Sequence, residues 1–153
     1  MNEGVIQILK KVGMGGTFDH LHEGHKHLIS TALSLSKNVV IGLTSESLLK
    51  NKKFYSKIQS YEARQNAIIS YVSKTSDISR VEIVRLEDQY GPPIYEADYE
   101  GICVSQETYQ NALKINSIRE SKGFKPMIII VIPILKNSNK EKISSTSIRA
   151  NKK

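Results

Sequence analysis

The chain of 153 residues has one cysteine, no tryptophan and no long apolar run. The single cysteine, Cys103, cannot form an internal disulfide, and no spacing of Cys and His resembles a zinc site. The longest apolar run, residues 127–135, contains Pro133 and is far shorter than the roughly 20 residues of a membrane span. The N-terminus lacks the basic-then-apolar order of a secretory signal. We therefore expect one soluble, cytoplasmic domain over residues 1–153.

The net charge of +7 is unevenly distributed. Residues 1–57 carry a net +4, residues 77–107 a net −6 and residues 108–153 a net +8. A nucleic-acid-binding protein more often has one continuous basic stripe with interleaved aromatic residues. Two basic ends around an acidic middle suit a small anionic ligand at least as well, and an RNA-binding protein is the alternative from another class. Solvated surface lysines also account for many of these charges.

Strand-like and helix-like segments alternate along the chain. The predicted strands are residues 5–14, 39–43, 81–86, 101–104 and 127–134, and the predicted helices are residues 24–36, 61–72 and 106–121. This alternation predicts right-handed β-α-β units and an α/β fold, a single Rossmann-like, doubly wound domain with a five-stranded parallel sheet. The Ile/Val-rich last strand is typical of a strand covered on both faces. Ligands of such a sheet bind beyond the carboxyl ends of its strands. We therefore expect the site at the turns that follow Met14, Leu43, Val104 and Ile134.

The turn after the first predicted strand reads GGTFDHLHEGH, residues 15–25. Two glycines at a strand end allow backbone N–H groups to approach a phosphate closely. His22 and His25 lie three residues apart, on one side of the first turn of the predicted helix. The N–H groups and dipole at a helix start favour an anion, and Thr17 adds a hydroxyl. The segment therefore predicts a phosphate site.

Two further interpretations of this turn involve its carboxylate. Asp19 could contact a metal ion or the phosphate of the nucleophile, or it could accept hydrogen bonds from backbone N–H groups of the loop. Zinc binding by His20, His22 and His25 together with Asp19 is a third alternative, although their spacing is irregular.

Residues 143–149, ISSTSIR, form a second polar turn after the last predicted strand. Ser144 is a candidate N-cap of a short helix. Consecutive hydroxyls, N–H groups at a helix start and the guanidinium of Arg149 would together bind phosphate. A frayed cap is the alternative interpretation.

The segment GGTFDHLHEGH resembles the GTFDxxHxGH signature of a nucleotidyltransferase superfamily, and ISSTSIR resembles its ISSTxIR motif. The resemblance implies that His22, His25 and Arg149 are catalytic and that ATP is the co-substrate, with Mg²⁺ shielding its phosphates. A phosphate oxygen of the acceptor would attack the α-phosphate in line, and pyrophosphate would leave. The implied ATP-binding residues are Gly16, Thr17, Phe18, Gly24, His25, Glu107, Ile143, Ser144, Ser145 and Thr146.

Three further segments follow predicted strands: GLTSE at residues 42–46, DQYGPP at 88–93 and VSQET at 104–108. Together they resemble the archaeal and eukaryotic family of phosphopantetheine adenylyltransferases. This implies transfer of AMP to 4′-phosphopantetheine, giving 3′-dephospho-coenzyme A in coenzyme A biosynthesis. The alternatives keep the chemistry on another acceptor: glycerol 3-phosphate with CTP, or nicotinamide mononucleotide.

The acceptor phosphate lacks an evident partner, because the arginine-rich RGxR segment of bacterial enzymes is replaced here by SQET. Arg64, Lys50, Lys53 and Arg119 are the candidate cations, and each taken singly is also explained as a surface charge. The implied acceptor contacts also include Thr17, Asp19, Thr44 and Ser105. We expect small-molecule substrates, no resident metal, no nucleic acid and no membrane, and a monomer.

Overall fold

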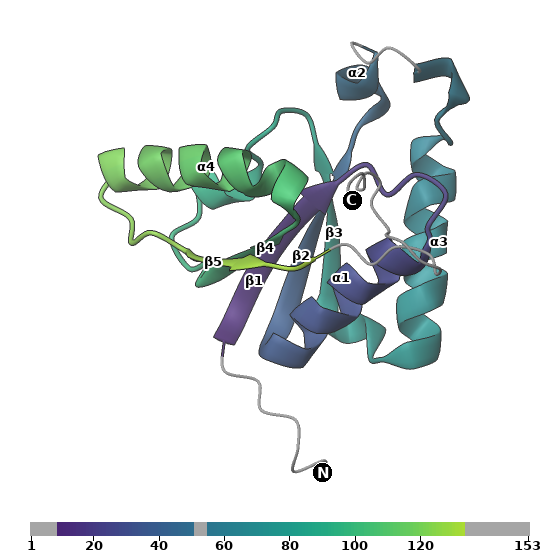
Figure 1. The fold of residues 1–153 in the computed structure, drawn as a ribbon, viewed down its shortest axis with the longest axis horizontal. Helices are drawn as coiled ribbons and strands as arrows, with labels where there is room; N and C mark the ends of the chain where they lie inside the picture. The colour runs from purple at the N-terminus through teal and green to yellow at the C-terminus, as the bar shows by residue number, and fades with distance from the viewer. Residues whose placement is uncertain (1–8, 51–54, 134–153) are drawn as a thin grey trace.

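The computed structural model describes residues 9–50 and 55–133, which contain one sheet of five parallel strands (Figure 1). The strands are β1 (Leu9–Gly16), β2 (Ser36–Thr44), β3 (Val81–Leu86), β4 (Gly101–Val104) and β5 (Ile128–Val131). Their order across the sheet is β3-β2-β1-β4-β5, so the direction of winding reverses between β1 and β4. The α/β class and the five-stranded parallel sheet are thereby confirmed. The reversal also creates the crevice in which sheets of this kind bind ligands.

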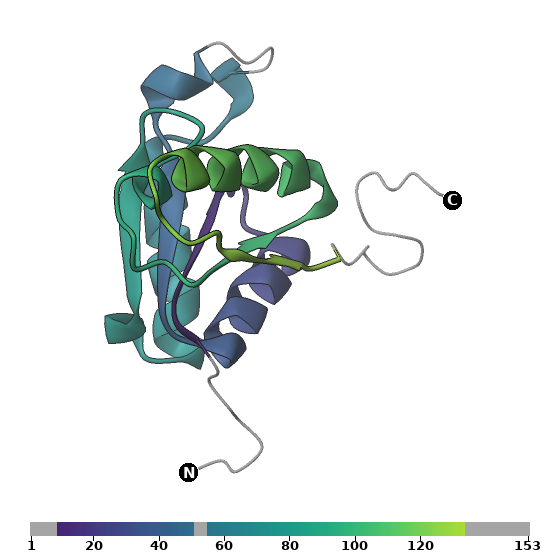
Figure 2. The ribbon, with the colours of Figure 1, turned by 90° about the vertical axis from the view of Figure 1, so that its left-hand side faces the viewer.

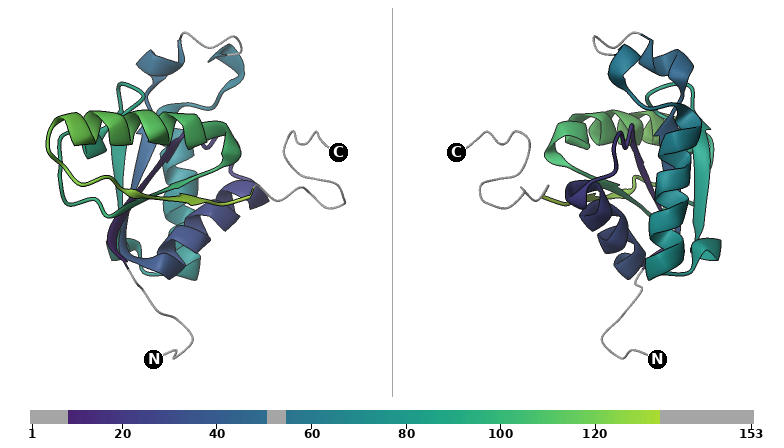
Figure 3. Two further views of the ribbon diagram at one scale, coloured as in Figure 1. Left: turned by 60° about the vertical axis from the view of Figure 1, so that its left-hand side comes forward. Right: turned by 90° about the vertical axis from the view of Figure 1, so that its right-hand side faces the viewer.

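Helices cover both faces of the sheet (Figures 1 and 3). They are α1 (Glu23–Leu35), α2 (Glu46–Leu49), α3 (Tyr61–Thr75) and α4 (Tyr109–Ser121), with short 3-10 turns η1 (Tyr55–Lys57), η2 (Ile78–Arg80), η3 (Pro92–Ile94) and η4 (Gln106–Thr108). The three predicted helices are confirmed within a few residues, the third beginning as a 3-10 turn. Among the described residues, no helix is long and apolar enough to cross a membrane.

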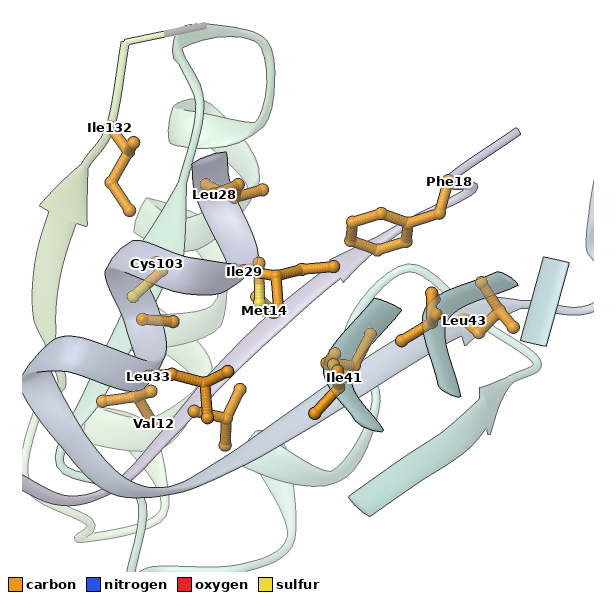
Figure 4. Packing of buried hydrophobic residues seen from close by; sticks show 14 residues of the cluster. Val12, Met14, Phe18, Leu28, Ile29, Leu33, Ile41, Leu43, Cys103 and Ile132 are labelled. Carbon is orange, nitrogen blue, oxygen red and sulfur yellow. The ribbon is translucent and has the colours of Figure 1, made fainter. Parts of the chain in front are cut away.

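The face under α1 and α3 holds the larger core (Figure 4). Successive side chains of a strand point to opposite faces, so Val12 and Met14 of β1 enter this core together. They pack against Ile29 of α1 and against Cys103 of β4. Burial raises the pKa of the Cys103 thiol to about 12. Cys103 is therefore a small buried apolar residue, as the sequence predicts.

The opposite face carries α4, which packs against β4 and β5 (Figure 2). Ala112 and Ile115 of α4 lie in one cluster with Ile102 of β4 and Val40 of β2. Within the described residues, α4 is the one regular α-helix that contributes to this cluster. The part of the face above β2 and β3 therefore borders an open space, and the site lies there.

The last strand corrects one expectation. A strand covered on both faces was predicted for residues 127–134, but each face of β5 is only partly covered, since Ile128 and Val131 are 58% and 45% exposed. β5 also ends the sheet order. Ile129 and Ile130 pack against the two cores. The strand is thus an edge strand in the described structure.

Candidate active site

A cleft of about 930 Å³ lies at the carboxyl ends of the central strands and extends over the sheet face that α4 covers. Its polar half contains residues 15–19, His22, His25, Thr44, Ser105 and Glu107. Its apolar half includes Val40, Val84, Pro92, Pro93, Tyr99, Ile102, Ala112 and Ile115. Three of the four turns predicted to surround a ligand, those after Met14, Leu43 and Val104, meet here. The turn after Ile134 lies outside the described residues.

The phosphate loop, residues 15–22, connects β1 to α1. Gly15 belongs to the floor of the cleft, where a Cβ atom would come within 3.3 Å of the Leu86 side chain. His22 is the N-cap of α1, and the first residues of the helix follow it directly. The backbone N–H groups at this helix start are donors with no partner inside the helix, so this end of the cleft favours an anion.

His22, at the end of the phosphate loop, and His25, in the first turn of α1, hold each other in place. His22 Nδ1 accepts a hydrogen bond from the Gly24 N–H at 3.1 Å, and His25 Nδ1 accepts one from the His22 N–H at 3.3 Å. The two rings are stacked, with centroids 3.7 Å apart and planes 20° apart. Because each Nδ1 acts as an acceptor, each neutral ring carries its proton on Nε2. Each histidine therefore has an Nε2–H donor, and both residues line the cleft.

Both rings are neutral at pH 7 in the absence of ligand. Burial and, to a smaller extent, the neighbouring His22 lower the pKa of His25 to about 4, while Asp19 opposes this shift. Partial burial also lowers the pKa of His22, while Glu23 opposes this shift. The histidines therefore act as fixed dipolar donors, and they gain positive charge only when an anion beside them raises these pKa values.

The middle of the phosphate loop has an unusual backbone. Phe18 has a φ of 53°. This residue is 3% exposed and lies in the larger core (Figure 4). The centroid of its ring is 5.3 Å from that of His25. Asp19 Oδ1 accepts a hydrogen bond from the Gln59 N–H at 2.9 Å. Asp19 thus bonds a backbone N–H, as one interpretation expects, but the donor comes from another loop. In the described ranges, no group of three or more His, Cys, Asp or Glu is arranged to hold a metal ion, so the zinc alternative gains no support.

The remaining predicted residues of the polar half come from β2 and β4. Thr44 Oγ1 donates to the Gly16 carbonyl at 3.0 Å and so joins the ends of β1 and β2. Ser105 follows β4, and its N–H donates to Thr108 Oγ1 at 3.1 Å. Glu107 is exposed at the rim. The structure therefore brings these predicted positions to the histidines.

Arg64 has a different place from the one expected. It is fully buried in α3, so it is not a surface charge, and it does not line the cleft. Its Nη1 donates to the carbonyls of Thr17 and Thr44, at 3.1 and 2.8 Å, and its Nε donates to Gln59 O at 3.0 Å. Arg64 supports the ends of β1 and β2 from behind the cleft, and the structure does not support its assignment as an acceptor ligand.

The predicted assignment of Arg119 as an acceptor ligand is also corrected by the structure. Its side chain is fully buried at the far end of α4 and lies outside the cleft lining. Its guanidinium donates to five backbone carbonyls, those of Lys125, Pro93, Glu96, Ala97 and Tyr99. All of its nitrogens are thereby engaged, so Arg119 fixes the loop before β4 instead of binding the acceptor.

The other predicted cations are not brought to the cleft. Lys50 is exposed at the end of α2, outside the cleft lining. The remaining predicted positions lie outside the described residues. They are Lys53 and the residues of the second motif, Ile143, Ser144, Ser145, Thr146 and Arg149.

Two residues of α4 were missed by the sequence analysis. Lys114 lines the cleft, and it is the one Lys or Arg that does so in the described part of the chain. Asn111, one turn earlier, donates from Nδ2 to the Gln89 carbonyl at 2.7 Å and links α4 to the turn after β3. Their spacing relative to the buried Ala112 and Ile115 is the signal that places them at the border of the cleft.

Comparison with known proteins identifies the family of this chain and other proteins with the same fold. A model of the cytidylyltransferase-like family matches residues 14–151, and the chain belongs to this family. A solved structure from Archaeoglobus fulgidus, described as a protein of unknown function, superposes with a TM-score of 0.74 at 34% identity, covering 87% of this chain and 96% of that one. A lipopolysaccharide core biosynthesis protein from Thermoplasma volcanium shares the fold, with a TM-score of 0.62 at 20% identity over 81% of this chain and 96% of that one.

Within the family, several archaeal relatives carry the name phosphopantetheine adenylyltransferase. The protein of Pyrococcus abyssi is 44% identical over 141 residues, which cover 92% of this chain and 89% of the relative. The protein of Methanopyrus kandleri is 41% identical over 140 residues, 92% of this chain and 88% of the relative. These identities over nearly the full length place the chain among the archaeal phosphopantetheine adenylyltransferases.

Proposed function

We propose that this protein transfers AMP from ATP to 4′-phosphopantetheine, giving 3′-dephospho-coenzyme A and pyrophosphate. The names of its relatives support this reaction. The observation that carries it is the stacked pair His22 and His25, which presents two Nε2 donors at a helix start inside a cleft. In the described residues of the cleft, no Ser, Cys or Lys nucleophile is paired with a base. Direct attack of an acceptor phosphate oxygen on the α-phosphate is therefore the reaction that the site favours.

The polar half of the cleft is the proposed ATP subsite. Backbone groups of Gly16, Thr17 and Phe18 and the helix start at Gly24 would approach the phosphates closely. The imidazoles of His22 and His25 would donate to oxygens on which negative charge develops during transfer. The proposed ATP contacts also include Glu107 at the rim and Ile143, Ser144, Ser145 and Thr146 of the second motif. Arg149 remains a proposed catalytic residue.

The apolar half is the proposed place of the acceptor arm. Pantetheine is a chain of methylene, dimethyl and amide groups, and this part of the cleft is lined mainly by apolar side chains such as Val40, Val84 and Ile102. Its phosphate would lie toward Thr17, Asp19, Thr44 and Ser105, where the two halves meet. Lys50 and Lys53 remain candidate cations for it, and Lys114 is a further candidate.

The residues present fit Mg²⁺ only as a companion of the triphosphate. Asp19 provides a carboxylate beside the phosphate loop, and Mg²⁺ commonly combines one or two carboxylates with substrate phosphates. When bound, the ion would neutralise part of the charge of the triphosphate.

We further propose that residues 1–153 form a single, monomeric, cytoplasmic domain that acts on small molecules and binds neither nucleic acid nor membrane. The match of one family model to residues 14–151 supports the single domain.

The test is pyrophosphate release with ATP or CTP against 4′-phosphopantetheine, unphosphorylated pantetheine, glycerol 3-phosphate and nicotinamide mononucleotide. We expect turnover with ATP and 4′-phosphopantetheine and strong rejection of pantetheine. The groups that bind the acceptor phosphate would be left without a partner when pantetheine is bound. Comparable kcat/KM with either of the other phosphorylated acceptors would overturn the acceptor assignment. Substituting Lys114→Met should raise the acceptor KM and leave the ATP KM unchanged if Lys114 meets the acceptor.

A further inference from the structure

The phosphate loop contains two non-glycine residues in the left-handed backbone region, Phe18 with φ 53° and His20 with φ 48°. Residues with a Cβ atom rarely adopt this conformation, and it persists where the surroundings fix it. Phe18 is fixed by its ring, which is buried in the core. The side chain of His20 is 68% exposed, so packing does not hold its backbone.

Gln59, in the segment before α3, provides the missing constraint. Its side-chain Oε1 accepts a hydrogen bond from the His20 N–H at 2.8 Å. Its own N–H donates to Asp19 Oδ1 at 2.9 Å. One residue, about 40 positions away in the sequence, therefore holds two successive residues of the phosphate loop.

Gln59 is itself anchored in the core. Its carbonyl accepts from Arg64 Nε at 3.0 Å, and the same guanidinium donates to the carbonyls of Thr17 and Thr44. Because Arg64 is fully buried, the anchor is fixed against the ends of β1 and β2. We call this set of hydrogen bonds the Gln59 clamp. It comprises the bonds of Gln59 with Asp19 and His20 and the bonds of Arg64 with Gln59 and Thr17.

We propose that Gln59 is a positioning residue for adenylyl transfer, an inference that rests on the proposed function. His22 follows His20 by two residues and is both the N-cap of α1 and the donor to His25 Nδ1. The direction in which the chain leaves His20 therefore sets the orientation of both imidazoles. When His20 is held at its positive φ, the Nε2 donors of the two imidazoles are oriented toward the reacting phosphate. Loss of this orientation should therefore lower kcat more than it weakens ATP binding.

The test compares Gln59→Ala with the matched control Gln65→Ala. Gln65 lies on α3, outside the cleft lining, and its side chain has no hydrogen bond in the described structure. We expect Gln59→Ala to lower kcat by about 10–100-fold, the scale of a misplaced catalytic group, with the ATP KM changed far less. Gln65→Ala should match the parent in both constants. A kcat of Gln59→Ala within about twofold of the parent would overturn the proposal.

A second substitution separates positioning from general destabilisation. Glycine adopts a positive φ without the strain of a residue with a Cβ atom, so His20→Gly should restore part of the kcat lost in Gln59→Ala. No recovery in the double variant would show that Gln59 does not act through the His20 backbone. Melting temperatures of all variants should stay close to the parent.

Amide hydrogen exchange gives a readout that does not require turnover. Loss of the Oε1 acceptor should speed exchange of the phosphate loop in Gln59→Ala and leave it unchanged in Gln65→Ala. Unchanged exchange in Gln59→Ala would overturn the clamp whatever the substrate is. Failure of the proposed function is recognised separately, as a parent protein without activity on ATP and 4′-phosphopantetheine.

Discussion

The hydrogen bonds of His25 predict which substitutions of this residue preserve catalysis. Its Nδ1 accepts from the His22 N–H, which leaves the Nε2–H as the donor toward the cleft. Glutamine places an amide N–H₂ near the position of Nε2, whereas asparagine places its amide near Nδ1. His25→Gln therefore keeps the donor and disturbs the bond to His22, and His25→Asn keeps an acceptor for His22 and loses the donor.

The expected magnitudes separate the two variants. Losing one preorganised donor to developing charge lowers kcat by about 10²–10³-fold, or roughly 3–4 kcal/mol. Losing a capping acceptor lowers the free energy of unfolding by about 0.5–2 kcal/mol. His25→Asn should thus be stable and nearly inactive. His25→Gln should retain more activity and lose more stability.

The assay is pyrophosphate release at saturating acceptor, with kcat and the ATP KM measured for both variants and the free energy of unfolding taken from urea titrations. His27→Asn is the matched control, because His27 lies on the same helix outside the cleft lining. A kcat of His25→Asn equal to or above that of His25→Gln would refute the assignment of the Nε2–H as the catalytic donor.

Three further predictions use the same measurements. The folded-state pKa of His25, about 4, lies below its ordinary value, so its neutral form stabilises the fold above pH 6.5 and this contribution is lost as the pH falls toward 4. Partial exposure reduces the effect to about 1 kcal/mol between pH 7 and 5, and urea unfolding should show a smaller pH dependence in His25→Asn than in the parent. Arg119→Lys should lower the free energy of unfolding by about 3 kcal/mol, because buried carbonyls lose donors, while the acceptor KM stays unchanged; a raised KM would restore a role in binding. Arg149→Ala should weaken ATP binding more than AMP binding in calorimetry, and equal losses would argue that Arg149 only supports its own segment.

The sheet and the phosphate loop could be predicted because their signals are local. Alternating or continuous apolar runs identify a strand such as β3, and a contiguous eleven-residue motif identifies the loop that carries His22 and His25. The edge position of β5 could not be predicted in this way. An Ile/Val run has the same composition in the middle of a sheet and at its edge, and the difference depends on strand order.

The roles of Arg64 and Arg119 were beyond sequence reasoning for a different reason. Their partners are backbone carbonyls, which every residue carries, so no pattern of side chains marks them. The acceptors of Arg119 extend from Pro93 to Lys125 and converge only in the folded chain. Gln59 could not be found from a local pattern either, because its partners in the phosphate loop, the Asp19 carboxylate and the His20 N–H, lie about 40 residues away.

The charges that line the cleft bear on the role proposed for the second motif. In the described residues the lining contains three carboxylates, Asp19, Asp88 and Glu107, and one ammonium group, Lys114. The two histidines add no net charge, because burial holds their pKa values below neutrality. A triphosphate would therefore meet N–H donors but also a net negative charge in the described part of the lining, which repels it. We therefore expect positive charge to come with the nucleotide as Mg²⁺ or from the basic C-terminal sequence that contains Arg149. The β- and γ-phosphates carry most of the negative charge of ATP, so the loss of Arg149 should affect ATP more than AMP.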